Sequence, residues 1–162
     1  MKTVNVTARG GNGVHEFDGG PNERLLHAGL RQGIALPYEC GTGTCGTCKA
    51  KLISGKVRDS WPSAPGAKSL RHDAGEFLLC QCVPMTECVI EVGRAIEKME
   101  MGSFRPAYFR GTVKRASLLA RDVVLLQIHI DRPLDFEAGQ FMVVKPGGFP
   151  KGFSRGRARD WS

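Results

Sequence analysis

Four cysteines in this chain have the type and the spacing to do chemistry together: Cys40, Cys45, Cys48 and Cys80. The first three follow the pattern C-x4-C-x2-C, and the fourth lies further along the chain. Four thiolates at this spacing hold [2Fe-2S] clusters, whose iron atoms accept and release electrons. The pattern therefore predicts an iron–sulfur centre and a role in electron transfer.

The glycines between the cysteines favour this interpretation. Three ligands on one short loop must bend around a compact inorganic core, and glycine adopts positive φ at little cost. Exposed amides on such a loop can also donate hydrogen bonds to the cluster sulfurs, which adjusts the reduction potential. The loop has glycine at Gly41, Gly43 and Gly46.

Two further cysteines, Cys82 and Cys88, are left over from this pattern. Because Cys80 and Cys82 are only two residues apart, the spacing alone leaves open which of them is the fourth ligand. Cys88 lies in a segment with the alternating pattern of a strand, residues 86–92, so we expect it to be a small buried hydrophobe.

Other uses of cysteine are weaker alternatives. A disulfide framework suits short secreted chains, and residues 1–6 have no apolar signal segment. Structural zinc usually takes two C-x2-C units, and here only Cys45 and Cys48 form one. A Rieske centre, in which histidines replace two cysteines, is unnecessary where four cysteines are present. Zinc stays the main competing hypothesis.

The composition is that of a globular protein. Of the 162 residues, 41% are hydrophobic, which is enough for a core. No run approaches the roughly 20 apolar residues of a membrane span, so we expect no membrane association. Free thiols indicate a reducing compartment, and we therefore expect the cytoplasm.

The positive charge is concentrated in the second part of the chain. Residues 1–100 hold 12 Lys and Arg against 11 Asp and Glu, a net of +1, and residues 101–162 hold 11 against 5, a net of +6. The basic run at residues 151–159 raises the question of nucleic acid. No nucleic-acid motif accompanies it, so we expect a solvated or phosphate-facing loop and no nucleic-acid partner.

The first part of the chain predicts an α+β domain with a β-grasp layout. A helix is expected between Asn22, as its N-cap, and Gly33, just past its end. The cysteine loop follows that helix, and the strands surround both in a mixed sheet. The expected strands are residues 3–8, 14–17, 50–53 and 87–92.

The second part predicts only strands. We place the first domain at residues 1–97, a linker at 98–106 and a second domain at 107–162. Three strands are expected in the second domain, at residues 108–114, 123–130 and 138–144, and they suggest the start of an antiparallel barrel that the chain does not complete. The second of these strands is mostly apolar, so we expect it to be well buried.

Several motifs together make the chain resemble the reductase components of bacterial multicomponent oxygenases, in particular the phenol hydroxylase and methane monooxygenase reductases. In the first domain the resemblance rests on the cysteine loop and two flanking segments, and in the second domain on three short segments. The residues concerned are 36–40, 79–84, 111–113, 131–134 and 136–141.

The resemblance implies an arrangement of domains and cofactors. In that family a plant-type [2Fe-2S] ferredoxin domain precedes an FAD-binding barrel and then an NADH domain. The segment around Leu79 and Cys80 is similar to the one that carries the last cluster ligand, which favours Cys80 over Cys82. The sequence stops before the rest of the barrel and the nicotinamide domain, so we expect a C-terminally truncated reductase.

The resemblance also implies a flavin site. The family's R-x-Y-S motif, which binds the FAD phosphates and the flavin, is matched by Arg159, Trp161 and Ser162, with Trp161 in the place of Tyr. A disordered tail is the competing interpretation of these residues. The implied function is one-electron transfer from FAD through the cluster to an oxygenase or another acceptor protein. A stand-alone ferredoxin and a zinc-binding module are the alternatives.

Overall fold

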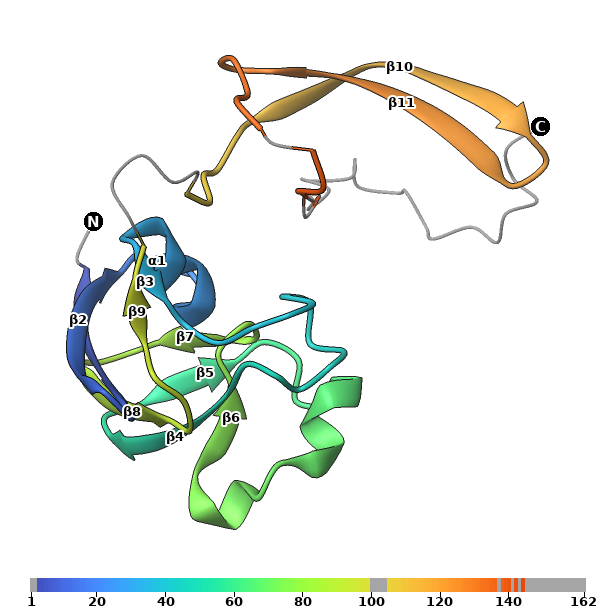
Figure 1. Ribbon diagram of the computed structural model, residues 1–162. Coiled ribbons are helices and arrows are strands. Elements are labelled where there is room, and N and C mark those ends of the chain that lie inside the picture. Colours follow the sequence, from blue (N-terminus) through green and yellow to red (C-terminus); the bar gives the residue numbers. More distant parts are fainter. Residues whose placement is uncertain (1–2, 100–104, 137, 141, 143, 145–162) are drawn as a thin grey trace. The chain divides into compact units, whose positions relative to one another are not determined.

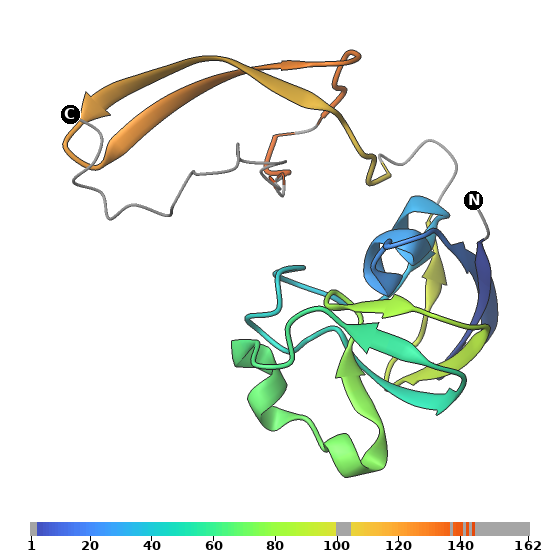
Figure 2. The same ribbon diagram turned by 180° about the vertical axis from the view of Figure 1, so that it is seen from behind.

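The computed structural model describes residues 3–99, 105–136, 138–140, 142 and 144. The chain divides into two compact units, Met1–Ala107 and Tyr108–Ser162. Figures 1 and 2 show them from opposite sides.

A five-stranded mixed sheet is the framework of the first unit, with the order β2-β1-β8-β4-β6. β1 pairs antiparallel with β2 and parallel with β8, and β4 pairs antiparallel with both β8 and β6. Each strand predicted in this part of the chain is found. The bounds are β1 Val4–Gly10, β2 Gly13–Gly19, β4 Lys49–Ser54, β6 Glu76–Leu78 and β8 Cys88–Val92.

The helix α1, Leu25–Arg31, contacts β2 and the short strand β3, Ile34–Ala35. Its buried side includes Leu25 and Leu26, which are 0% and 1% exposed. Burial of each of these side chains stabilises the folded state by about 1.5–3 kcal/mol. In the described part of the chain, no helix has the length and apolar character needed to cross a membrane.

The two ends of α1 differ in how well the sequence predicts them. Gly33 follows the helix with φ of 80°, and its N–H donates to the Leu30 carbonyl at 3.0 Å, as predicted. The prediction of Asn22 as N-cap is wrong, because the N-cap is Arg24 and no side chain caps the helix. Asn22 instead adopts φ of 58° and accepts a hydrogen bond from Arg58 at 3.0 Å.

Three smaller elements complete the first unit. β3 pairs with β9, Glu97–Lys98, and β5, Val57–Asp59, pairs with β7, Cys82–Pro84. Two 3-10 helices, η1 Pro65–Ser69 and η2 His72–Ala74, lie between β5 and β6. Lys98, the first residue of the predicted linker, is therefore paired with the first unit, while the proposed boundaries at 97 and 107 stay a prediction.

The second unit contains an antiparallel hairpin, β10 Gly111–Ala120 and β11 Val123–Ile130. The predicted strand at 123–130 is found, and the first one begins and ends later than predicted. The third predicted strand is wrong at the described positions 138–140, 142 and 144, which lie in no strand and include a turn. Arg159, Trp161 and Ser162 lie outside the described residues.

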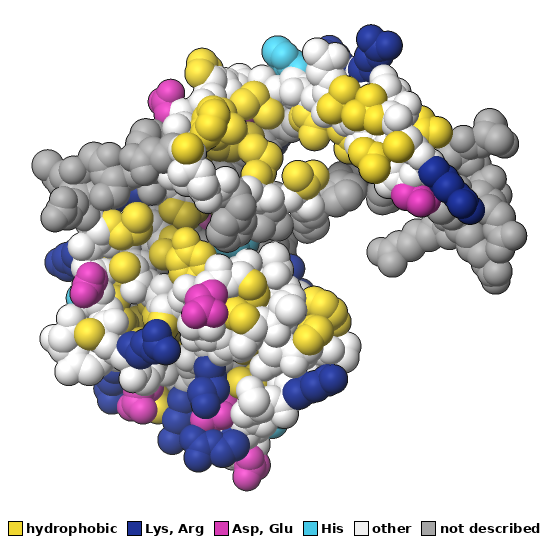
Figure 3. Space-filling view, turned by 45° about the vertical axis from the view of Figure 1, so that its right-hand side comes forward, with side chains coloured by type: hydrophobic (Ala, Val, Ile, Leu, Met, Phe, Trp, Pro, Cys, Tyr) yellow, Lys and Arg dark blue, Asp and Glu magenta, His cyan; other side chains and the backbone are white. Residues whose placement is uncertain are grey.

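The expected burial of residues 123–130 is also wrong. Val124, Leu125 and Leu126 are 57%, 54% and 50% exposed, and Figure 3 shows hydrophobic side chains along the hairpin surface. An apolar strand is buried only where a second layer packs on it, and within the described residues β10 and β11 form a sheet of two strands.

Candidate metal centre

The loop with three cysteines, residues 40–48, runs from the segment after β3 to the first residue of β4. Gly41, Gly43 and Gly46 have φ of 64°, 94° and 82°, as expected for a loop that turns back on itself. Since Cys48 directly precedes β4, this end of the loop is fixed by the main sheet.

Cys40 and Cys45 form the outer pair of sulfurs. Cys45 is exposed and Cys40 is half-buried. The amides of Thr42 and Cys45 each donate to Cys40 Sγ at 3.4 Å, and the Thr47 amide donates to Cys45 Sγ at 3.5 Å. Burial raises the pKa of Cys40, but the amide donors outweigh it and lower this pKa to about 6. The loop is therefore built to hold a thiolate at Cys40.

Cys48 and Cys80 form the inner pair, at 1% and 0% exposed. The Leu79 amide donates to the Cys48 carbonyl at 3.0 Å, which brings the segment after β6 against the loop. Cys48 Sγ donates to Cys80 Sγ at 3.1 Å. This bond lowers the pKa of Cys80 to about 7 and raises the pKa of Cys48. Of the two thiols, Cys80 therefore has the lower pKa.

The two pairs share one electrostatic neighbourhood. The charge of Cys45 acts on the pKa of Cys48, and the charge of Cys40 acts on the pKa of Cys80. The charge of Cys80 also acts on the pKa of Cys82, so the choice of the four cysteines as ligands stays a prediction.

The remaining cysteines are placed differently. Cys82 lies in β7 opposite Asp59 and is 0% exposed. Burial raises its pKa to about 12, and in the described residues no hydrogen bond joins its sulfur to another cysteine sulfur. Cys88 lies in β8 opposite Val6, is 3% exposed, and has a pKa raised to about 11 by burial. Cys88 is the small buried residue that the sequence predicted.

The donor set fits a two-iron core better than a single ion. A structural zinc site requires four ligands around one point, whereas a [2Fe-2S] core carries two thiolates on each of two irons. One outer and one inner pair of sulfurs match the second arrangement.

Two residues that the sequence analysis missed support the loop. The Gly66 amide in η1 donates to the Gly43 carbonyl at 2.9 Å, and a Cβ at Gly66 would lie 2.7 Å from the Gly46 nitrogen. Gln81 is 1% exposed, and its Nε2 donates to Cys80 Sγ at 3.5 Å. A polar residue directly after Cys80 was a visible signal for Gln81, whereas nothing local in the sequence marks Gly66.

The surface around the outer pair is formed in part by the cysteine loop and the residues before it. Four residues in and beside the cysteine loop are exposed: Tyr38, Glu39, Thr42 and Thr44. The Thr47 hydroxyl donates to Glu39 at 3.0 Å and holds this carboxylate beside the loop.

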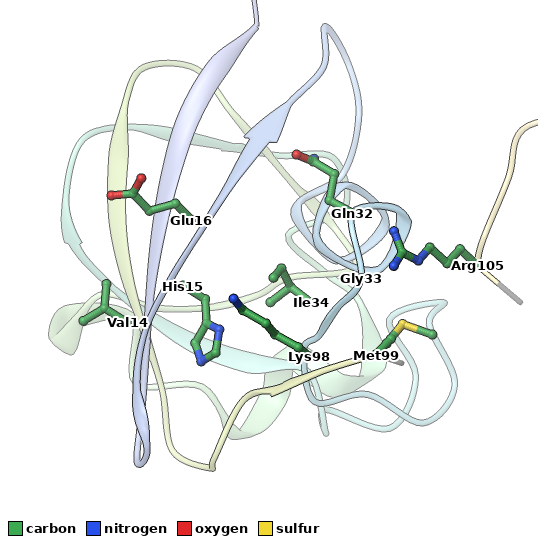
Figure 4. Close-up of a pocket in the computed structure, with 9 residues that line it drawn as sticks. All are labelled: Val14, His15, Glu16, Gln32, Gly33, Ile34, Lys98, Met99 and Arg105. Atoms are coloured by element: carbon green, nitrogen blue, oxygen red, sulfur yellow. The ribbon is translucent and has the colours of Figure 1, made fainter. Parts of the chain in front are cut away.

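A separate cavity of about 310 Å³ lies between β2, the end of α1 and β9 (Figure 4). His15, Gln32, Lys98 and Arg105 are among its lining residues, and no cysteine is. It is therefore distinct from the candidate metal centre.

Comparison with known proteins supports the same chemistry. A family profile described as "2Fe-2S iron-sulfur cluster binding domain" matches residues 11–85, a range that contains all four candidate ligands. Residues 11–85 are therefore similar to [2Fe-2S] cluster-binding domains. The predicted cofactor is thereby confirmed.

The relatives extend beyond this domain. The chain is 34% identical to the reductase component of phenol 2-monooxygenase from Pseudomonas sp. strain CF600, over 90% of this chain and 40% of that protein. It is 33% identical to the xylene/toluene monooxygenase electron transfer component of Pseudomonas putida, over 88% of this chain and 39% of that protein. The chain is also similar to the solved FAD apo form of a ferredoxin reductase in carbazole 1,9a-dioxygenase. The two superpose with a TM-score of 0.70 at 30% identity, over 87% of this chain and 43% of that one.

These matches confirm the resemblance inferred from the motifs: the chain is a relative of oxygenase reductase components. It spans about 40% of the length of the curated relatives it matches. The described residues are mainly strands with one α-helix, and the fold is similar to that of the solved ferredoxin reductase.

Proposed function

We propose that this chain carries electrons one at a time through a [2Fe-2S] cluster bound by Cys40, Cys45, Cys48 and Cys80. The supporting observation is the hydrogen bond from Cys48 Sγ to Cys80 Sγ at 3.1 Å, in a domain whose loop also carries Cys40 and Cys45. When bound, the cluster supplies a centre with a reduction potential of about −400 mV, which is low enough to reduce many metal centres.

The protein's own contribution is to hold four thiolates and to exclude water from half of them. Amide donors at Cys40 and Cys45 stabilise negative charge on the outer pair. Burial of Cys48 and Cys80 keeps the inner pair dry. Electrons would therefore enter and leave at the outer side, where Tyr38, Glu39, Thr42 and Thr44 form the docking face.

We further propose that the chain works as part of an NADH-dependent oxygenase reductase. NADH delivers two electrons as hydride, and a flavin separates them for a one-electron relay. In this scheme the first unit is a β-grasp domain and the β10–β11 hairpin is the start of an FAD barrel. Arg159, Trp161 and Ser162 would contact the FAD, and an oxygenase component would accept the electrons.

A stand-alone ferredoxin is the second candidate, favoured by one observation. The first unit contains all six cysteines and a core of its own, with Leu79 and Ile90 both 0% exposed. Cluster chemistry would then be the same, but a separate protein would supply the electrons.

An electron-relay assay tests the proposed function. NADPH and an unrelated ferredoxin reductase supply electrons, and cytochrome c reports their arrival by its absorbance. We expect the rate to rise with the concentration of the cluster-loaded chain. The variant Cys45→Ser, which lacks one outer ligand, serves as the control and should give less than about a tenth of that rate. A cluster-loaded chain that leaves the cytochrome rate at its background value would contradict the proposal.

A further inference from the structure

Gln81 is an unusual residue to find where it lies. It is the largest polar side chain among the fully buried residues, at 1% exposed, and it directly follows Cys80. A buried amide costs stability unless its polar atoms are satisfied. Its Nε2 donates to Cys80 Sγ at 3.5 Å, within the usual range for a sulfur acceptor.

The cysteine loop is shaped around this amide. A Cβ at Gly43 would lie 2.8 Å from Gln81 Nε2 and 3.1 Å from its Cδ. The backbone of Gly43 is itself held in place, because its carbonyl accepts the Gly66 amide at 2.9 Å. The absence of a side chain at Gly43 therefore leaves the space in which the Gln81 amide reaches the sulfur.

The backbone of Gln81 is fixed as firmly as its side chain. Its amide donates to the Leu78 carbonyl, and its carbonyl accepts the Ser60 amide, both at 3.0 Å. The residue is thus held at both ends, and the direction of its side-chain donor toward Cys80 is determined by the fold.

We infer that Gln81 is a positioning residue that sets the reduction potential of the cluster through its hydrogen bond to Cys80 Sγ. This inference rests on the proposed assignment of Cys80 as a cluster ligand. Reduction adds one electron to the centre and neither forms nor breaks a bond, so negative charge on the ligand sulfurs grows. A donor at Cys80 stabilises the reduced state more than the oxidised state and raises the potential.

The alternative role for Gln81 is packing alone. A packing role would change stability on substitution but would leave the potential unchanged, because it depends only on the volume of the side chain. The potential therefore separates the two roles, and a methionine of similar length without a donor is the suitable replacement.

The experiment is a spectroelectrochemical titration of the reconstituted full chain. Gln81→Met should lower the midpoint potential. We expect the equilibrium constant for reduction to fall about tenfold, which corresponds to about 59 mV for one electron. Gln81→Glu, which keeps the shape, should lower it further at neutral pH. As the pH is lowered and the introduced carboxyl is protonated, it becomes a hydrogen-bond donor, and the potential of this variant should rise toward that of the wild type. Gln127→Met, on the exposed strand β11, is the matched control and should leave the potential unchanged.

A second measurement covers the case in which a variant binds the cluster poorly. The wild-type chain is labelled with ¹⁵N at its glutamine side chains and reduced. Pulsed EPR should then show a magnetic coupling between the cluster and one side-chain nitrogen, and the Gln127→Met variant should retain this coupling. Absence of that coupling, or a wild-type potential in loaded Gln81→Met, would overturn the inference. A wild-type chain that binds no cluster would instead overturn the proposed function.

Discussion

Replacing Cys80 with alanine is expected to abolish the visible absorption of the reconstituted chain, while replacing Cys82 with alanine leaves it intact. Among the described residues, Cys80 is the cysteine whose sulfur accepts a hydrogen bond from Cys48 Sγ, at 3.1 Å. Loss of one of the four thiolates leaves one iron with a single protein ligand, so we expect less than about a tenth of the wild-type iron content.

Cys82→Ala is a matched control for this substitution, because both residues are 0% exposed and lie in neighbouring positions. It should cost about 1 kcal/mol or less in stability, the effect of removing one small buried atom. Iron analysis and the visible spectrum of both variants check the prediction. A coloured Cys80→Ala chain beside a colourless Cys82→Ala chain would assign the ligand role to Cys82 instead.

Truncation after Ala107 is expected to leave a folded, cluster-binding domain with an unchanged spectrum and a melting temperature within a few degrees of the full chain. The four cysteines and the buried core all lie in the first unit. The buried hydrophobic residues of the described chain all fall between Val6 and Ile96. An isolated two-stranded hairpin is at best marginally stable in water.

A shorter truncation, after Gly93, is the informative comparison. It removes Ile96, which is 0% exposed and whose backbone exchanges two hydrogen bonds with the Asn12 side chain at 2.8 and 2.9 Å. It also removes β9, the partner of β3. We expect the free energy of unfolding to fall by about 2–5 kcal/mol, as it does when other large buried side chains are removed. Thermal unfolding of both fragments checks this, and equal stability of the two would show that residues 94–107 add nothing to the first unit.

The sequence was most informative where chemistry and local geometry coincide. The cysteine spacing, the glycines of the loop and Gly33 all act within a few residues, so their roles can be inferred without knowing the fold. Asn22 shows the limit of such reasoning, because a partner 36 residues away, Arg58, decides the use of its side chain. Gly66 and the Gly43–Gln81 contact depend on segments that only the folded chain brings together.

The second unit shows a different limit. The apolar pattern of β11 correctly predicts a strand, but it does not tell which surface covers that strand. Leu125 and Leu126 are about half exposed because burial requires a neighbouring layer, and a pattern of residues in one strand contains no information about that layer.

The most direct test of the central claim is an anaerobic reductive titration of the reconstituted chain, combined with analysis of iron and acid-labile sulfide. The account predicts two irons and two sulfides per chain, and visible absorption that bleaches partly on uptake of one electron. A chain that stays colourless after reconstitution with iron and sulfide, or that binds one zinc ion in their place, would contradict it.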